Sequence, residues 1–143
     1  MALTDNQRQL LNSAKKAALE IGEHGKALAN LVGELSLCDC QNLQWQPTDG
    51  YDALAPDHMR VQIKTRKSWT TSGVNPSGRV PRFGRKSGYQ FDRGELGERD
   101  QQFEVAGVWE MSPGRIEELR KKEKESTELH ISTFKKNAQR IIS

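Results

Sequence analysis

The sequence predicts an α/β domain in which helices pack on a small mixed sheet. Apolar residues recur at helical spacing near the N-terminus, and polar and apolar residues alternate from Arg60 to Arg66. A second strand-like run extends from Phe103 to Met111. At 143 residues the chain can bury a core without disulfides or zinc, so we expect a single domain over residues 1–143.

The N-terminal third predicts two helices and a strand. Thr4 with Gln7 three residues later is a helix-start pattern, which begins the first helix. A second apolar stripe, in residues 27–35, predicts a helix that ends between residues 33 and 36. Residues 38–48 then alternate and predict a half-exposed strand.

The C-terminal third is less regular. Residues 94–102 are polar, so a strand here is either short and exposed or covered by a second copy of the chain, which leaves a homodimer open. The run from Phe103 to Met111 predicts a strand with its odd-numbered residues on one face. Ser112 before Pro113 predicts the start of a helix, and a last helix capped at residue 132 or 133 is expected to dock Phe134, Ala138, Ile141 and Ile142 on the core.

A hairpin at residues 51–66 brings chemically useful side chains together. Pro followed by Asp in the linker at residues 55–58 suits a turn, so Asp52 of the first strand comes close to Gln62 of the second. On the second strand, alternation places one set of polar residues on the same face: Arg60, Gln62, Lys64 and Arg66. A carboxylate, an amide oxygen and an ammonium group therefore converge.

This combination suits metal-assisted hydrolysis of a phosphodiester. Hard divalent cations such as Mg²⁺ or Mn²⁺ prefer oxygen ligands and keep waters, one of which can become a nucleophile. Asp52 would anchor the ion, and Gln62 and the backbone carbonyl of Ile63 would offer neutral oxygens. Lys64 would position the attacking water, help to deprotonate it and balance charge on the phosphate.

These residues resemble the signature of the PD-(D/E)XK nuclease superfamily, which is an Asp, a short hairpin, then an acid or Gln, an apolar residue and Lys. Here Gln62-Ile63-Lys64 begins ten positions after Asp52, and the resemblance covers roughly residues 20–67. It implies a restriction-endonuclease-like core and a metal-dependent endonuclease. It also implies a Glu on the preceding helix, for which Glu23 is the matching position. Tyr51 stands where the name-giving Pro would be, and the neutral Gln62 holds a metal less strongly than an acid does.

The distribution of charge predicts a nucleic-acid partner, for which we favour DNA over RNA without excluding RNA. The net charge is only +3, but the segment from Arg60 to Arg93 holds nine Lys or Arg and one acid, which calls for a polyanion. Residues 68–88 read as a long irregular segment in which aromatic and basic residues are interleaved, which is typical of phosphate contacts with base stacking. The candidate contacts are Arg60, Arg66, Lys67, Arg79, Arg82, Arg85 and Lys86.

The remaining features concern location and the alternatives. Cys38 and Cys40 lie too close for an ordinary disulfide and have no further ligands for zinc, so we expect reduced thiols and a cytoplasmic protein. No apolar run approaches membrane-spanning length, so no membrane partner is expected. Two other functions stay open: a catalytically weak or inactive nucleic-acid-binding module, and a small interaction subunit of a larger assembly.

Overall fold

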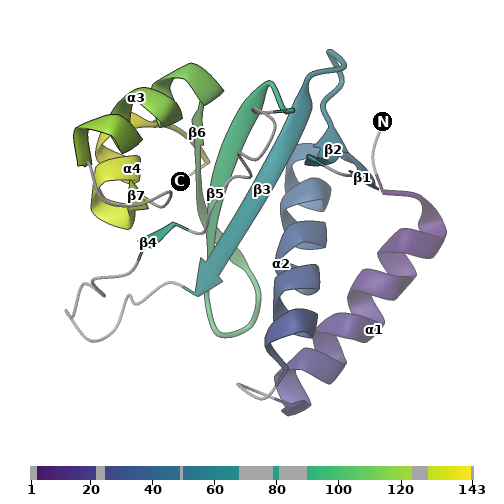
Figure 1. Ribbon diagram of the computed structural model, residues 1–143. Helices are drawn as coiled ribbons and strands as arrows, with labels where there is room; N and C mark the ends of the chain where they lie inside the picture. Colours follow the sequence, from purple (N-terminus) through teal and green to yellow (C-terminus); the bar gives the residue numbers. More distant parts are fainter. Residues whose placement is uncertain are drawn as a thin grey trace.

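The structure is a computed structural model that describes residues 3–21, 25–48, 50–67, 79–80, 90–123 and 129–142. Its helices and strands are, in chain order, α1 (Asp5–Ile21), α2 (Lys26–Gln41), β1 (Gln44–Thr48), β2 (Tyr51–Leu54), β3 (Arg60–Lys67), β4 (Arg79–Val80), β5 (Arg93–Arg99), β6 (Val105–Met111), α3 (Pro113–Glu123), β7 (Leu129–His130), α4 (Ile131–Asn137) and β8 (Gln139–Ile142). Six strands form one sheet in the order β1-β2-β3-β5-β6-β8, and β4 pairs with β7 (Figure 1).

The sheet is mixed, as the sequence predicts. Strands β3 and β5 run parallel, and the other neighbours in the sheet are antiparallel. The predicted hairpin is confirmed: β2 and β3 pair with Ala53 opposite Val61 and Leu54 opposite Arg60. The two strands that carry the candidate site are therefore neighbours near the middle of the sheet.

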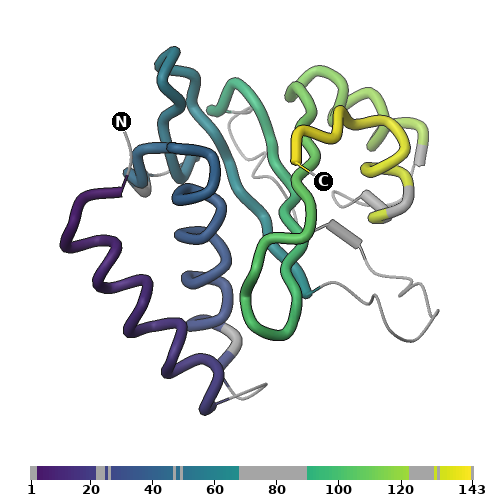
Figure 2. Tube along the Cα trace, turned by 180° about the vertical axis from the view of Figure 1, so that it is seen from behind, coloured from purple at the N-terminus to yellow at the C-terminus, as the bar shows by residue number. Residues whose placement is uncertain are grey.

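Helices cover both faces of this sheet (Figures 1 and 2). On one face, α1 and α2 form a hydrophobic cluster that includes buried Val61 and Ile63 of β3. On the other face, α3 and α4 pack over Leu96 of β5 and Trp109 of β6. The alternation of β3 places Gln62 and Lys64 on this second face, because Lys64 lies beside Leu96. No helix in the described ranges is both long and apolar enough to cross a membrane.

The N-terminal helices begin as predicted, but α2 ends later. Thr4 caps α1 through reciprocal hydrogen bonds: the Gln7 amide donates to the Thr4 hydroxyl at 3.1 Å, and the Thr4 amide donates to Gln7 Oε1 at 3.0 Å. Helix α2 continues to Gln41, so the prediction that it ends between residues 33 and 36 was wrong, as was a strand from residue 38. Gly33 is buried within the helix, and the left-handed residue Asn42 (φ 59°) ends it.

Strand β5 is buried inside the sheet, which corrects the expectation that the strand at residues 94–102 is either short and exposed or covered by a second copy of the chain. Arg93–Arg99 lies in the interior of the sheet, between β3 and β6. Its acids find partners within the chain: Glu95 accepts a hydrogen bond from Gln41 at 2.7 Å, and Glu98 lies 2.8 Å from Lys135. The polar strand is thus covered by one copy of the chain, and the observation that left a homodimer open is explained without one.

The last segment also differs from the prediction. Helix α3 begins at Pro113, and the Ser112 hydroxyl accepts a hydrogen bond from the amide of Arg115, as expected for a cap. Helix α4 ends at Asn137, and residues 139–142 form the edge strand β8 rather than the end of a helix. Pairing with β6 satisfies backbone groups of that strand, and this outweighs the helical spacing of the apolar residues.

Strand β6 does not keep its odd-numbered residues on one face, which corrects that expectation. Trp109 and Met111 pack in the cluster under α3 and α4, whereas Phe103 and Val105 pack in the cluster under α1 and α2. A shift in the pairing with β5 between Glu98 and Arg99 exchanges the faces.

Candidate active site

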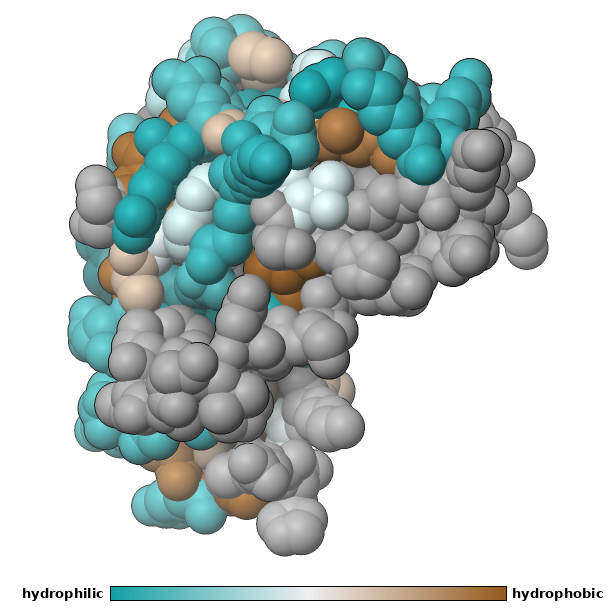
Figure 3. All heavy atoms as spheres, turned by 90° about the vertical axis from the view of Figure 1, so that its left-hand side faces the viewer, coloured by the Kyte–Doolittle hydropathy of each residue, from teal (hydrophilic) through white to brown (hydrophobic). Residues whose placement is uncertain are grey.

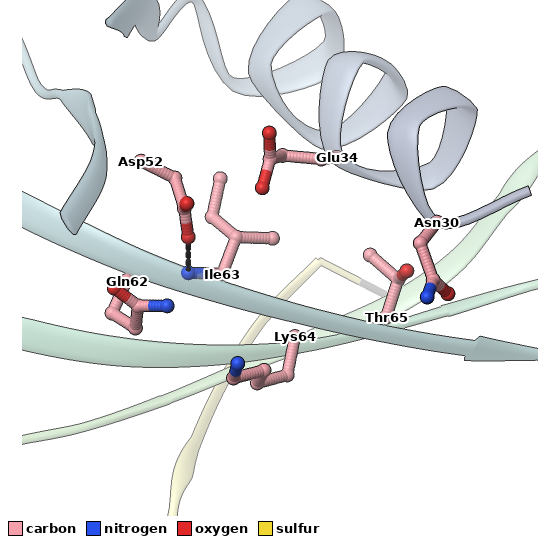
Figure 4. Close-up of a pocket in the computed structure, with 7 residues that line it drawn as sticks. All are labelled: Asn30, Glu34, Asp52, Gln62, Ile63, Lys64 and Thr65. Atoms are coloured by element: carbon pink, nitrogen blue, oxygen red, sulfur yellow. Dashed lines mark hydrogen bonds between the residues drawn. The ribbon is translucent and has the colours of Figure 1, made fainter. Parts of the chain in front are cut away.

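The candidate site lies where β2 and β3 diverge. Their pairing covers Ala53 with Val61 and Leu54 with Arg60, so β3 continues beyond Val61 without a paired β2 residue. Asp52 takes the place of a backbone partner there, because its Oδ2 accepts a hydrogen bond from the amide of Ile63 at 2.8 Å (Figure 4). In a strand the N–H and C=O of one residue point to the same side, so the Ile63 carbonyl also points into the gap beside Asp52.

Seven residues line a hollow of about 200 Å³ at this gap: Asn30, Glu34, Asp52, Gln62, Ile63, Lys64 and Thr65. Asn30 and Glu34 come from one side of α2, one helical turn apart. The hollow therefore brings together the acid, the amide and the amine that the sequence predicts. It also adds a second acid, Glu34, which the sequence analysis missed.

Glu34 faces Asp52 across the hollow (Figure 4). The indole of Trp45 donates a hydrogen bond to Glu34 Oε2 at 2.7 Å, which fixes the carboxylate on the β1 side of α2. Two acids that face each other in a partly buried hollow repel when both are ionised, and a cation between them relieves that repulsion.

The surroundings of Glu34 change its acidity. The pKa of Glu34 is raised to about 7: burial is the largest cause, a hydrogen bond and charge repulsion from Asp52 also raise it, and the bond from Trp45 and the charge of Lys64 lower it. Glu34 therefore exchanges its proton near neutral pH. A carboxyl group with such a pKa in a polar hollow is a common feature of functional sites.

Gln62 and Lys64 reach the hollow from the other side of β3. Side chains alternate along a strand, so Gln62 and Lys64 lie on one face of β3 and Ile63 and Thr65 lie on the other. Figure 4 shows Lys64 across the strand from Glu34. Lys64 is close enough for its charge to lower the pKa of Glu34. The site thus spans the edge of β3 that β2 leaves unpaired beyond Val61, with the two acids on the α2 side and the amine on the other.

A close contact holds α2 against this strand. A Cβ atom on Gly33 would lie 2.6 Å from the hydroxyl and 3.0 Å from the Cβ of Thr65, so only glycine fits without movement. Gly33 precedes Glu34 in the helix, so this contact sets the distance between Glu34 and β3, the strand whose Ile63 amide donates a hydrogen bond to Asp52.

The positions of several predicted site residues are not described. Glu23, Arg82, Arg85 and Lys86 lie outside the described residues, and for Arg79 only the backbone in β4 is described. Glu23 therefore has no described position relative to the hollow. In the part of the chain that is described, the helical acid at this site is Glu34.

The predicted contacts on β3 have partners in the protein. Arg60 bonds both oxygens of Asp92 at 3.2 Å, and this bond lowers the pKa of Asp92. Arg66 is largely buried and lies 3.7 Å from Glu98, and it donates to the backbone carbonyl of Lys67. These cations therefore also serve the fold.

The donor set is one that suits a hard cation. Within the described ranges, no group of three or more His, Cys, Asp or Glu side chains could hold a metal ion. The hollow offers two carboxylates with neutral oxygens, and magnesium is commonly held by one or two carboxylates with waters and substrate phosphate.

Cys38 is buried and Cys40 exposed, and both are free thiols. A comparison with models of protein families and with curated proteins found no match.

Proposed function

We propose that this protein is a metal-dependent nuclease that hydrolyses phosphodiester bonds of nucleic acid, DNA rather than RNA, with Mg²⁺ or Mn²⁺ as its cofactor. The proposal includes membership of the PD-(D/E)XK superfamily and a restriction-endonuclease-like core. One observation supports it above the others: Asp52 bonds the amide of Ile63 at the point where β2 leaves β3, with Glu34 facing it.

The metal would be held by groups from three elements. Asp52 uses Oδ2 for the Ile63 amide, which leaves Oδ1 for the ion, and Glu34 offers its carboxylate from α2. The Ile63 carbonyl adds a neutral oxygen from the same gap, and the side chain of Gln62 lies beside it. A bound divalent ion would supply Lewis-acid activation of the phosphodiester and a water of lowered pKa.

The protein's own groups then orient the substrate and move the proton. Lys64 places a positive charge beside the unpaired edge of β3, where it would contact the scissile phosphate, orient the attacking water and help to deprotonate it. Glu34, with a pKa of about 7, would lose its proton near neutral pH and hold the ion as a carboxylate. Trp45 holds this carboxylate in place through its indole N–H.

Cleavage of plasmid and single-stranded DNA in Mg²⁺ or Mn²⁺ tests the proposal. We expect Lys64→Ala and Asp52→Asn to lose at least about a hundredfold in rate, which is the usual effect of removing a transition-state partner. Lys122→Ala, which removes an exposed lysine from the end of α3, is the matched control and should cleave as the parent does. Equal rates for the parent and Lys64→Ala would reject the role of Lys64.

Metal binding gives a readout that does not depend on activity. Calorimetric titration with Mn²⁺ should show binding to the parent and markedly weaker binding to Asp52→Asn and Glu34→Gln. Unchanged binding in both variants would place the ion elsewhere.

A second function remains a candidate because Gln62 is neutral and the hollow holds only two acids in the described residues. A non-catalytic nucleic-acid-binding module would bind DNA in EDTA, lose affinity steeply with salt and cleave nothing. That result would favour this function over the nuclease.

A further inference from the structure

Basic residues from three elements come together on the face of the sheet that carries Lys64. The register aligns one row across four strands, which consists of Lys64, Leu96, Trp109 and Arg140. Neighbouring strands lie about 4.8 Å apart, so this row crosses roughly 14 Å of the sheet and starts at the candidate site. Its two ends are cationic and its middle is the buried core under α4.

A second cluster lies beside this row. Glu98 of β5 accepts a hydrogen bond from Lys135 of α4 at 2.8 Å and lies 3.7 Å from Arg66 of β3. Two cations share one acid, so the cluster keeps a net positive charge. Arg66 follows Lys64 by two residues and therefore lies on the same face of β3.

Trp109 joins the two groups. Its ring lies 4.4 Å from the Lys135 ammonium and 4.9 Å from the Arg140 guanidinium. Gly107 makes this arrangement possible, because a Cβ there would lie 2.8 Å from the indole and 3.2 Å from the Arg140 side chain. Two cations are thus held near each other on a ring with little exposure, although they repel.

The surface around Lys135 and Arg140 carries exposed positive charge. Within the described ranges no carboxylate forms an ion pair with Arg140, which is exposed, and Lys136 next to Lys135 is exposed too. The side of the molecule on which α3 and α4 lie is mainly hydrophilic where its residues are described (Figure 3). Aligned cations with one acid among them complement a chain of phosphates.

We infer that Lys135 and Arg140 form a phosphate-binding surface for the nucleic-acid backbone that flanks the cleaved bond, with the largely buried Arg66 adding positive charge beneath it. The identity of this ligand rests on the proposed function. The nucleic acid then leaves the candidate site at Lys64 and continues towards α4 and β8. Contacts of this kind position a strand without reading its sequence.

A double variant, Lys135→Gln with Arg140→Gln, tests this surface. Binding of a fluorescent DNA duplex and of a single strand is measured over a series of salt concentrations in EDTA, so that no cleavage occurs. We expect weaker binding to all sequences, and a slope of log affinity against log salt that is smaller by about two, since two phosphate contacts are lost. Lys121→Gln with Lys122→Gln, which removes the same charge from the exposed end of α3, should keep most of the parent's slope.

The charge-conserving pair Lys135→Arg with Arg140→Lys separates binding from folding. It should keep the salt slope, and thermal unfolding of all variants shows whether the fold is kept. An unchanged slope in the Gln double variant, or an equal loss in the α3 control, would overturn the inference. If the parent binds DNA with this salt slope but cleaves nothing, the nuclease is rejected and the phosphate-binding surface is supported. If the parent cleaves DNA and the Gln double variant keeps the parent's salt slope, the nuclease is supported and the surface is rejected.

Discussion

Trp45 and Glu34 form the contact on which the acidity of the candidate site depends. The indole hydrogen bond favours the ionised carboxylate and so lowers the pKa of Glu34, which is still about 7 because burial raises it more. Glu34 must be ionised to hold a cation, so affinity for a divalent ion falls as the pH drops through this pKa.

Trp45→Phe should move the pH range in which affinity for Mn²⁺ falls to higher pH. Loss of the indole N–H removes a group that lowers the pKa, so Glu34 keeps its proton at pH values where the parent has lost it. Titrations with Mn²⁺ over a range of pH measure the shift, and Trp109→Phe, which changes an indole on the other face of the sheet, is the control. Equal displacement of the profile in both variants would contradict the role of Trp45.

Glu95 is a second acid with unusual surroundings, and it concerns stability. The side chain is fully buried, and burial raises its pKa to about 6, against the hydrogen bond from Gln41 and the charge of Arg93. Its Oε2 lies 3.4 Å from Arg93 but makes no hydrogen bond in the described part of the chain. The folded state thus binds the proton more tightly than the unfolded state.

Glu95→Gln should therefore change how stability depends on pH. In the parent, the free energy of unfolding falls as the pH rises from the ordinary value of 4.5 through about 6, because the buried group must ionise. The contribution is about 2 kcal/mol, from 1.36 kcal/mol per pKa unit. The amide keeps the bond from Gln41 and does not ionise, so the variant should gain on the parent above this range. Denaturant unfolding on both sides of it checks the sign, with Glu118→Gln, an exposed acid of α3, as control.

At the scale of elements, the contact between α2 and β3 fixes the geometry of the site. Gly33→Ala would push the helix away from Thr65 and separate Glu34 from Asp52. We expect a loss of about 1–3 kcal/mol in the free energy of unfolding, typical of overpacking, together with weaker Mn²⁺ binding.

Two further variants test this contact. Thr65→Ala, combined with Gly33→Ala, removes the hydroxyl at 2.6 Å and the methyl at 3.2 Å, so part of the loss should be recovered. Gly114→Ala in α3 has no atom within 4 Å of the new Cβ and should cost nothing. No recovery in the double variant would show that the contact with Thr65 is not the cause.

The elements also show what could be predicted from the sequence. The capping box at Thr4 and the hairpin at Asp52 depend on local patterns, and both were predicted correctly. Strand β5 was not expected to be buried, because the partners of Glu95 and Glu98 come from α2 and α4. Strand β8 was predicted as helix because its pairing with β6 is a long-range contact.

Within the candidate site the same division holds. Asp52, Gln62 and Lys64 were found by their spacing in one hairpin, and they line one hollow. Glu34 was missed because its partner Asp52 is distant in sequence and the resemblance directed attention to Glu23. Its position as a carboxylate in the otherwise apolar turns of α2 was the available signal.

At the scale of the whole molecule, Glu98 connects β3, β5 and α4 through Arg66 and Lys135. The ion pairs of Glu98 stabilise the fold, and its negative charge weakens the attraction of the phosphate-binding surface for DNA. Glu98→Gln should therefore lower stability and raise affinity for DNA, which are opposite effects of one substitution.

The magnitudes follow from burial and charge. Glu98 is 12% exposed and Arg66 15%, so leaving the cation without its acid should cost about 1–3 kcal/mol in the free energy of unfolding. The salt slope of DNA binding should increase by about one as one more cation becomes available. Glu118→Gln, which breaks the exposed pair with Arg115, should change both quantities little. A loss of stability without a gain in affinity would contradict the proposed surface.

The bond between Asp52 and the Ile63 amide has a consequence for mutagenesis. Residue 63 takes part through its main chain, with the N–H holding the acid and the carbonyl pointing into the gap, so any side chain there presents the same two groups. An alanine scan would therefore count too few participants. Replacing the amide that joins residues 62 and 63 by an ester removes the N–H and weakens the carbonyl of residue 62 as an acceptor, and it would release Asp52 from β3 while every side chain stays unchanged.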